Sequence, residues 1–380
     1  GLLKALDTKP KVEQKIDTAN PEAYEYYLRG YHIFKNINAT DADYEVIIDL
    51  LKKSLYLNRQ YMNTYELLGW CYIYKKNIKK KDKYAKAIAI WKEGISIAKT
   101  KNINSKNNNI GSLVNSISLI YLRHKYNYKK AYESLIQSQK LLKNLNDIKG
   151  IMDNYNILGI YYSDIGDYEN GILHFSKVKE YEDMLEIPNE LSVGNTAYQY
   201  HYMGEFDKAE KMHIKAAKLG EEKAGYIHPL HHKHLADVYI DMKEYEKAKA
   251  TLDKVEKFEN YNIKDNNNKL NERKLRQGYF TFLIAKTLSK KKLNINISKD
   301  IKEINEISEL RKKNKFIDDE DYKYFRWNYY LYQVFEDFSY LKIAYKYIKE
   351  KADNLEPDLA AKFLGYPLPK AIVEEWEKVK

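Results

Sequence analysis

DNYNILGIYYSDIGDYENGILHFSKVKEYE, the stretch from Asp153 to Glu182, decides the fold of this chain. Apolar and aromatic side chains recur in it every three or four residues, first from Tyr155 to Tyr162 and again from Tyr168 to Val178, with a Gly-Asp turn between the two runs. This spacing places each run on one face of a helix. The stretch therefore predicts two helices joined by a tight turn.

A small residue stands near the middle of each predicted helix. Gly159 and Gly171 are 12 residues apart, and two antiparallel helices can approach closely where both carry a small side chain. The same pair recurs downstream as Ala197 with Ala209 and as Ala236 with Ala248, so the frame repeats every 38 to 39 residues. A regular frame of this kind is typical of helical-repeat proteins.

Upstream copies of the frame are looser. Ser118 and Ala131 form a pair one residue too far apart, and Gly69 pairs with Ala87 only if the Lys-rich stretch 75–81 is an inserted turn. We expect six helical hairpins over residues 21–260, after a lead-in at residues 1–20. A single hairpin cannot bury its apolar stripe alone, so neighbouring hairpins must stack.

Beyond residue 260 the pattern weakens. After an Asn-rich loop, three helical stretches are predicted near residues 270–290, 299–313 and 321–351, and together residues 261–357 are interpreted as degenerate repeats. Residues 358–380 are predicted to be a terminal cap with a short amphipathic helix, covering the last open core.

Two stretches resemble a known family. The opening NPEAYEYYLRG at residues 20–30 and the closing FLGYPLP at residues 363–369, followed by IVEEW, are similar to tetratricopeptide-repeat regions of bacterial signalling proteins. Those regions lie C-terminal to class III adenylate or guanylate cyclase domains or to Ser/Thr kinase domains. The resemblance implies an all-α, tetratricopeptide-like solenoid, a right-handed superhelix of helix-turn-helix hairpins with a C-terminal helical cap. It also implies that any catalytic domain lies upstream of Gly1.

The sequence departs from that family in two places. The insertion at residues 75–81 interrupts the second copy, and Asn58-Arg59 replaces the usual Asp-Pro after a second helix. The repeat period is also longer than the roughly 34 residues of a tetratricopeptide repeat. These differences leave the expected fold intact.

Composition narrows the function classes. The net charge is +11, from 65 basic and 54 acidic residues, but the lysines are interleaved with acidic residues, which favours solvated helix faces over a specific nucleic-acid surface. Cys71 is the only cysteine, so neither a disulfide framework nor a cysteine zinc site is predicted. No apolar run reaches the roughly 18 residues of a membrane span. A cytoplasmic protein is the expectation.

Chemistry-bearing motifs are scarce. We find no phosphate-binding loop, nucleophile elbow or cyclase metal motif, so no catalytic residue, no cofactor and no enzyme activity is predicted for this chain. The cluster HPLHHKH at residues 228–234 contains His231 and His234 on one helical face, with His201 one repeat away. A metal site would need a further converging ligand. The alternative, in which His232 fills the large repeat position and the others face solvent, is favoured, and no metal is predicted.

Ligand binding is expected on the first helix of each hairpin, because these helices line the concave surface of stacked repeats. Residues one step off the buried stripe would face a ligand there: Asn115, Arg123, Asn156, Ser163, Tyr198, His201, Tyr202, Lys233 and Asp237. Asn amides and basic side chains suit an extended peptide or a carboxylate terminus. The predicted partner is therefore a protein or peptide, or a second copy of the chain in a homodimer.

Three functions remain open at this stage. The leading hypothesis is the interaction or sensor region of a larger cytoplasmic bacterial signalling protein, a cyclase or kinase. A peptide-pheromone receptor is the first alternative, although its usual head would need to precede Pro21. A non-catalytic assembly scaffold is the second alternative.

Overall fold

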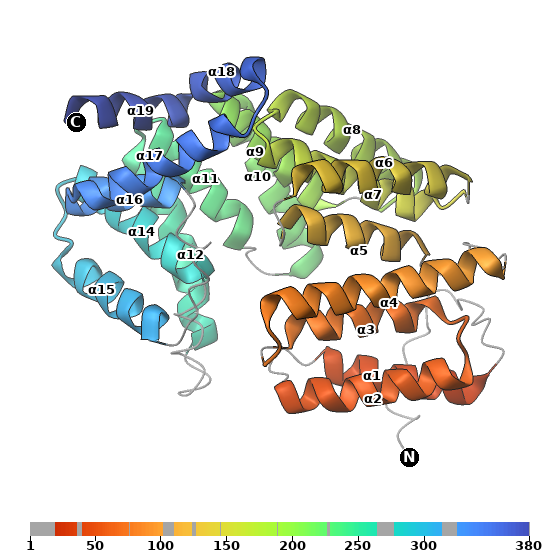
Figure 1. Ribbon diagram of the computed structural model, residues 1–380. Helices are drawn as coiled ribbons and strands as arrows, with labels where there is room; N and C mark the ends of the chain where they lie inside the picture. Colours follow the sequence, from red (N-terminus) through yellow and green to blue (C-terminus); the bar gives the residue numbers. More distant parts are fainter. Residues whose placement is uncertain are drawn as a thin grey trace. The chain divides into compact units, whose positions relative to one another are not determined.

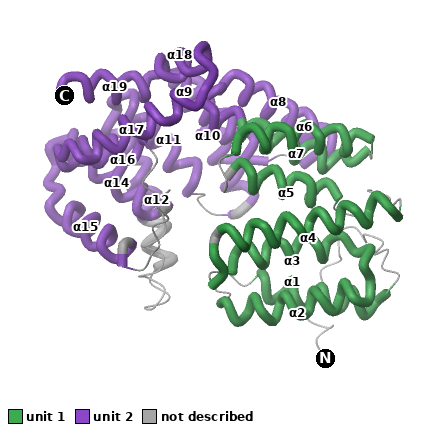
Figure 2. Tube along the Cα trace, in the orientation of Figure 1, with its two compact units in different colours: residues 1–161 green, residues 162–380 purple. Residues whose placement is uncertain are grey.

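The computed structural model describes residues 20–35, 40–75, 77–101, 110–123, 127–144, 146–187, 189–225, 229–263, 277–313 and 325–379. These residues form 18 helices and no strand (Figure 1), which confirms the expected all-α, tetratricopeptide-like fold of helical hairpins. The chain divides into two compact units, residues 1–161 (unit 1) and residues 162–380 (unit 2), shown in green and purple in Figure 2.

Unit 1 consists of successive helix pairs. Its helices are α1 (Pro21–Phe34), α2 (Asp41–Leu57), α3 (Met62–Tyr74), α4 (Lys80–Thr100), α5 (Ile110–Arg123), α6 (Tyr128–Asn144) and most of α7 (Ile148–Asp164). Each odd-numbered helix from α1 to α5 packs against the helix that follows it, and α3 also packs against both α1 and α5. The first helices of the hairpins therefore lie next to one another, as the red-to-yellow ribbon of Figure 1 shows.

Local sequence sets the helix boundaries of unit 1. The Asn20 side chain accepts hydrogen bonds from the backbone N–H groups of Glu22 and Ala23, at 3.0 and 3.1 Å, so it caps α1 just ahead of a proline. Helix α3 ends at Tyr74 and α4 begins at Lys80, so the Lys-rich stretch begins after α3 and ends inside α4. A small residue is needed at Gly69, because a Cβ there would collide with the indole of fully buried Trp91.

Unit 2 continues the pairing and adds the C-terminal helices. It contains the end of α7 and then α8 (Tyr168–Met184), α9 (Glu190–Met203), α10 (Phe206–Ala224), α11 (Pro229–Asp241), α12 (Tyr245–Ile263), α14 (Gln277–Lys292), α15 (Ser298–Lys313), α16 (Phe325–Phe335), α17 (Phe338–Asp353), α18 (Pro357–Gly365) and α19 (Pro367–Val379). Helix α11 packs against both α9 and α14, and α14 packs against α16.

One turn geometry recurs inside three hairpins of unit 2. Gly166, Gly204 and Lys243 have φ values of 80°, 85° and 62°, in the left-handed region. The residue after each one donates its backbone N–H to a carbonyl five residues earlier, for example Glu205 to Tyr200 at 2.9 Å. This left-handed cap ends the first helix and reverses the chain.

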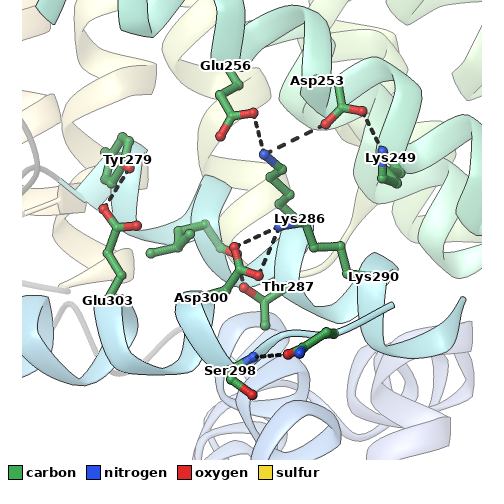
Figure 3. A network of polar contacts seen from close by, with 12 residues as sticks. Lys249, Asp253, Glu256, Tyr279, Lys286, Thr287, Lys290, Ser298, Asp300 and Glu303 are labelled. Carbon is green, nitrogen blue, oxygen red and sulfur yellow. Dashed lines mark hydrogen bonds and ion pairs between the residues drawn. The ribbon is translucent and has the colours of Figure 1, made fainter. Parts of the chain in front are cut away.

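Buried charge ties α14 to its neighbours, as Figure 3 shows. The ammonium group of Lys286, a residue only 5% exposed, forms ion pairs with Glu256 and with Asp253 of α12, the latter at 3.7 Å. One turn later Lys290 donates to both oxygens of Asp300 in α15, each at 2.9 Å. The α14–α15 region is thus a packed continuation of the stack.

One expectation for the C-terminal region differs from the structure. The predicted helix over residues 321–351 is two helices in its described part, because Glu336 adopts a φ of 58° and the Asp337 side chain caps the start of α17. The terminal cap contacts more than the last hairpin. Phe363 packs against Gly166 and Pro367 against Gly204, at the left-handed turns that precede α8 and α10.

Candidate functional site

The first helices of unit 1 carry a row of aromatic side chains. We call the side formed by α1, α3, α5 and the unit 1 part of α7 the first-helix face. On α1 the ring of Tyr27 stacks with those of Tyr24 and Tyr31, at centroid distances of 6.3 and 5.8 Å, and meets Tyr61 edge-on at 5.0 Å. Burial, with Glu66 contributing, raises the pKa of Tyr27, so its hydroxyl stays protonated. Tyr31 remains 36% exposed.

Carboxylates lie beside this row. Glu66 of α3 accepts a hydrogen bond from the Ser112 hydroxyl of α5 and is electrostatically coupled to Asp153 of α7. Burial raises the pKa of Asp153 to about 6, with Asp147 and Glu66 adding to the effect and Lys149 opposing it. Negative charge is therefore crowded on this part of the face.

Asn115, a predicted ligand-binding residue, holds helices together. Its residue is 4% exposed. The side-chain amide donates to the Gly150 carbonyl at 3.0 Å and its oxygen accepts from Ser138 at 2.9 Å and from Asn154 at 3.2 Å. These bonds join α5, α6 and α7, so the amide of Asn115 is used in hydrogen bonds inside unit 1.

The corresponding helices of unit 2 enclose a buried polar cluster around Arg326 of α16. Its Nη1 donates to Asp241 at 2.7 Å and to the Tyr330 hydroxyl at 3.0 Å, and the guanidinium carbon lies 4.9 Å from the Tyr202 ring centroid. On the other side, His201 Nε2 lies 2.9 Å from the same Asp241 oxygen. Arg326 is 4% exposed, so its ion pair with Asp241 is buried where α9, α11 and α16 meet.

The charges of this cluster are set by Arg326. Burial works to raise the pKa of Asp241, but the guanidinium and His201 outweigh it and lower the pKa to about 2. Asp237 lacks the direct ion pair, and burial raises its pKa to about 7 even though Arg326 opposes the shift. Burial, followed by the charge of Arg326, lowers the pKa of His201. Asp241 is thus a carboxylate that neutralises the guanidinium, whereas Asp237 holds its proton up to a pH of about 7.

The remaining predicted binding residues have varied surroundings. The Tyr198 ring packs on Tyr202 at 4.4 Å inside unit 2, and the Lys233 amine donates to the Gly278 carbonyl of α14 at 3.1 Å. Asn156 in unit 1 and Ser163 in unit 2 are half-buried. The side chain of Arg123 lies outside the described residues. Ligand binding by these residues stays a prediction, and of the nine, the structure brings only His201, Tyr202, Tyr198 and Asp237 together, in a packed interior.

The histidine cluster is part of the same interior. His213 and His234 stack at 5.6 Å, and burial lowers the pKa of both, that of His234 to about 3. The His232 ring lies 2.7 Å from a Glu221 oxygen, while His228 lies outside the described residues. Within the part of the chain that the structure describes, no three His, Cys, Asp or Glu side chains are arranged to hold a metal ion.

The sequence pattern did not identify the carboxylates of Glu66, Asp153 and Asp241 on the first helices of the two units, or the arginine that contacts Asp241. Glu66 and Asp153 stand three and six residues before the small residues Gly69 and Gly159, so aligning the copies on that frame would have placed both on the first-helix face. Asp241 follows Asp237 by one helical turn. Arg326 gave no signal, because it lies outside the regular repeats.

Three comparisons place the chain among known proteins. No family model matches it, and no curated protein sequence matches it. Solved structures do: a signal transduction ATPase with a tetratricopeptide repeat sensor from Pyrococcus horikoshii has a TM-score of 0.50 at 16% identity, over 75% of this chain and 41% of that one. Yeast Tom70 also scores 0.50 at 16% identity, over 97% of this chain and 68% of that chain.

A third structure, the APC/C hetero-tetramer Cut9-Hcn1, scores 0.50 at 11% identity and covers 91% of this chain and 55% of that one. The chain thus spans less than two thirds of the first of these structures. At these sequence identities the likeness concerns the fold alone, and that fold is the tetratricopeptide-type stack of helical hairpins.

No helix among the described residues is both long and apolar enough to cross a membrane.

Proposed function

We propose that this chain binds an extended segment of a partner protein on the first-helix face of unit 1. The observation that carries the proposal is the difference between the two sets of first helices. In unit 2, α16 places Arg326, which is 4% exposed, against Tyr202 of α9 and Asp241 of α11. In unit 1, Tyr31 of α1 keeps 36% of its surface exposed. Partly exposed aromatic rings are the usual anchors of protein interfaces.

Polar groups on the same face suit a peptide backbone. The Asn63 amide lies beside the rings, 3.4 Å from the Tyr61 hydroxyl, and Asn156 is half-buried on α7. Amide side chains both donate and accept hydrogen bonds, so they can satisfy an extended chain. A binding role, with no catalysis by this chain, fits this set of groups best.

We also propose that the chain is the sensor or regulatory region of a larger cytoplasmic signalling protein. The support is the motif resemblance at residues 20–30 and 363–369, together with the fold shared with a Pyrococcus horikoshii ATPase that has a tetratricopeptide repeat sensor. Reading the coding sequence upstream of Gly1 tests this: a cyclase, kinase or ATPase domain is expected. A DNA-binding head would favour the pheromone-receptor alternative, and the absence of any further domain would favour the scaffold alternative.

The binding face is tested by peptide display on the whole chain. Peptides selected from a random library of about twelve residues are measured against Tyr31→Ala and Asn156→Ala, with Tyr56→Ala as the control. Tyr56 is 88% exposed on the second helix of its hairpin. We expect the two face variants to weaken binding about tenfold or more, and the control to leave it unchanged. Peptides that bind all three variants alike would show that the ligand lies elsewhere.

A further inference from the structure

Two carboxylates on the first-helix face of unit 1 indicate the charge of a ligand. Glu66 on α3 and Asp153 on α7 come from different hairpins and interact electrostatically, and Ser112 of α5 donates to Glu66. Asp153 forms no hydrogen bond or ion pair within the described ranges of the chain. Although the chain as a whole carries a net charge of +11, the carboxylates of Asp147 and Glu66 both act on Asp153 here, with the cation of Lys149 opposing them.

Aromatic rings border these carboxylates. Glu66 is one of the groups that raise the pKa of Tyr27, after burial and Tyr61. The Tyr27 ring also packs edge-on against Tyr61, the residue that precedes α3. The rings of Tyr24, Tyr27 and Tyr31 follow one another along α1. Carboxylates and the faces of aromatic rings both attract cations, and a guanidinium can use both at once.

Unit 2 shows how this chain holds a cation with the same groups. The Arg326 guanidinium lies 4.9 Å from the ring centroid of Tyr202 and 5.8 Å from that of Tyr330, with Asp241 at 2.7 Å. Tyr202 and Asp241 lie on the first helices α9 and α11, whereas Tyr330 belongs to α16 itself. Asp241 follows its small residue Ala236 by five positions, whereas Glu66 precedes Gly69 by three. The chain therefore already contains one tyrosine-and-carboxylate cation site, which α16 fills.

We propose that the first-helix face of unit 1 contains a subsite for a cationic side chain, Arg or Lys, of the extended segment that binds there. This inference rests on the proposed function and adds the charge of the ligand to it. Glu66 and Asp153 supply the counter-charge, and the rings of Tyr27 and Tyr31 cover the aliphatic stem and the charged head. A bound cation also relieves the repulsion between the two carboxylates.

The first test compares a cationic peptide with a neutral one of the same shape. The probe is a fluorescein-labelled (Ala-Arg-Ser)n peptide of about nine residues, and its partner replaces Arg by citrulline, which keeps the shape and removes the charge. We expect the Arg peptide to bind about tenfold more tightly or better, and the advantage to shrink at high salt. Equal anisotropy titrations for the two peptides, or no binding of the Arg peptide, would overturn the proposal.

The second test uses isosteric variants of the carboxylates in the whole chain. Glu66→Gln and Asp153→Asn should each weaken the Arg peptide about tenfold and leave the citrulline peptide unchanged. The matched control is Glu133→Gln, which removes an exposed carboxylate from the second helix α6. Circular dichroism melts confirm that each variant is folded. If neither carboxylate variant differs from the control, the subsite is wrong.

Proton release gives a readout that structural damage does not mimic. A cation beside Asp153 lowers its pKa, so binding at pH 6 should release about half a proton per peptide, measured by calorimetry in two buffers of different ionisation enthalpy. Asp153→Asn should abolish the release, and no release from the unaltered chain would remove Asp153 from the site.

If display peptides bind the first-helix face without any preference for Arg, the proposed function holds and only the cationic subsite is wrong. If they ignore Tyr31→Ala, the proposed function itself fails.

Discussion

The first helices of the two units carry similar groups and use them differently. In unit 2, tyrosines and the carboxylate of Asp241 surround Arg326, which is 4% exposed. In unit 1, tyrosines and the carboxylates of Glu66 and Asp153 line a face whose rings remain partly exposed. The repeat frame positions the helices in both units. Whether a set of first helices becomes core or remains a surface depends on whether the chain itself supplies the cation and the covering helix.

The largest expected effect comes from removing the internal cation. Arg326→Met leaves Asp241 buried beside His201 without its counter-charge, which should lower the free energy of unfolding of unit 2 by roughly 3–5 kcal/mol. Amide hydrogen exchange of α9 and α11 under native conditions measures the loss, and α3 in unit 1 is the internal reference. A matched double variant, Arg326→Met with Asp241→Leu, should recover most of it, because no buried charge is left unpaired.

A loss below about 1 kcal/mol for Arg326→Met would contradict this account. It would mean that water or a side-chain rearrangement replaces the guanidinium at little cost. The enclosed face of unit 2 would then resemble the exposed face of unit 1, and the comparison would lose its physical basis.

The second prediction concerns the pH dependence of stability, to which Asp237 and Asp241 contribute with opposite signs. The pKa of Asp237 is raised to about 7, so its contribution to stability is fully present below pH 4 and is lost as the pH rises through 7. The pKa of Asp241 is lowered to about 2, so its contribution is present above pH 4 and is lost as the pH falls to 2. Asp237→Asn should therefore remove about 4 kcal/mol of the destabilisation that unit 2 otherwise acquires between pH 4 and pH 8.

Hydrogen exchange of α11 across that pH range checks the prediction for Asp237. Asp153 in unit 1 is the comparison. Because its pKa is raised to about 6, its destabilising effect on unit 1 should reach its full size about one pH unit below that of Asp237. Asp153→Asn should flatten the pH dependence of α7 and leave α11 as it was. An Asp237→Asn variant with an unchanged pH profile would show that Asp237 is ionised in the folded state at pH 4.

Much of the fold could be predicted from the sequence, because small residues such as Ala197 and Ala209 mark helix contacts that local spacing determines. The site could be predicted only in part. Asn115, His201, Tyr202 and Asp237 stand one step off the apolar stripe, which is where an exposed groove residue would stand in a regular repeat. The structure buries them, since Asn115 donates to the Gly150 carbonyl and Arg326 of α16 lies against Tyr202 and Asp241. Arg326 and Asp241 are 85 residues apart, and no periodic pattern connects them.

The third prediction tests how the C-terminal helices close unit 2. Gly204 has a φ of 85°, and a Cβ there would lie 2.6 Å from Pro367 of α19. Gly204→Ala should therefore cost about 1–2 kcal/mol through backbone strain and should also push α19 away. Hydrogen exchange should rise in α19 and α9 together, since the two helices are in contact. A rise confined to the turn itself would show that α19 is anchored elsewhere.

The smallest expected effect comes from the uncovered counterpart of that turn. Lys243 has the same left-handed backbone, with a φ of 62°, and follows α11 as Gly204 follows α9. Lys243→Gly relieves the strain of a side chain in this conformation but increases the chain entropy of the unfolded state, so we expect a stabilisation of less than about 1 kcal/mol. Urea denaturation of the variant measures it. If Lys243→Gly destabilised unit 2 as strongly as Gly204→Ala, backbone conformation would not be what distinguishes these turns, and contacts of the lysine side chain would have to hold the hairpin instead.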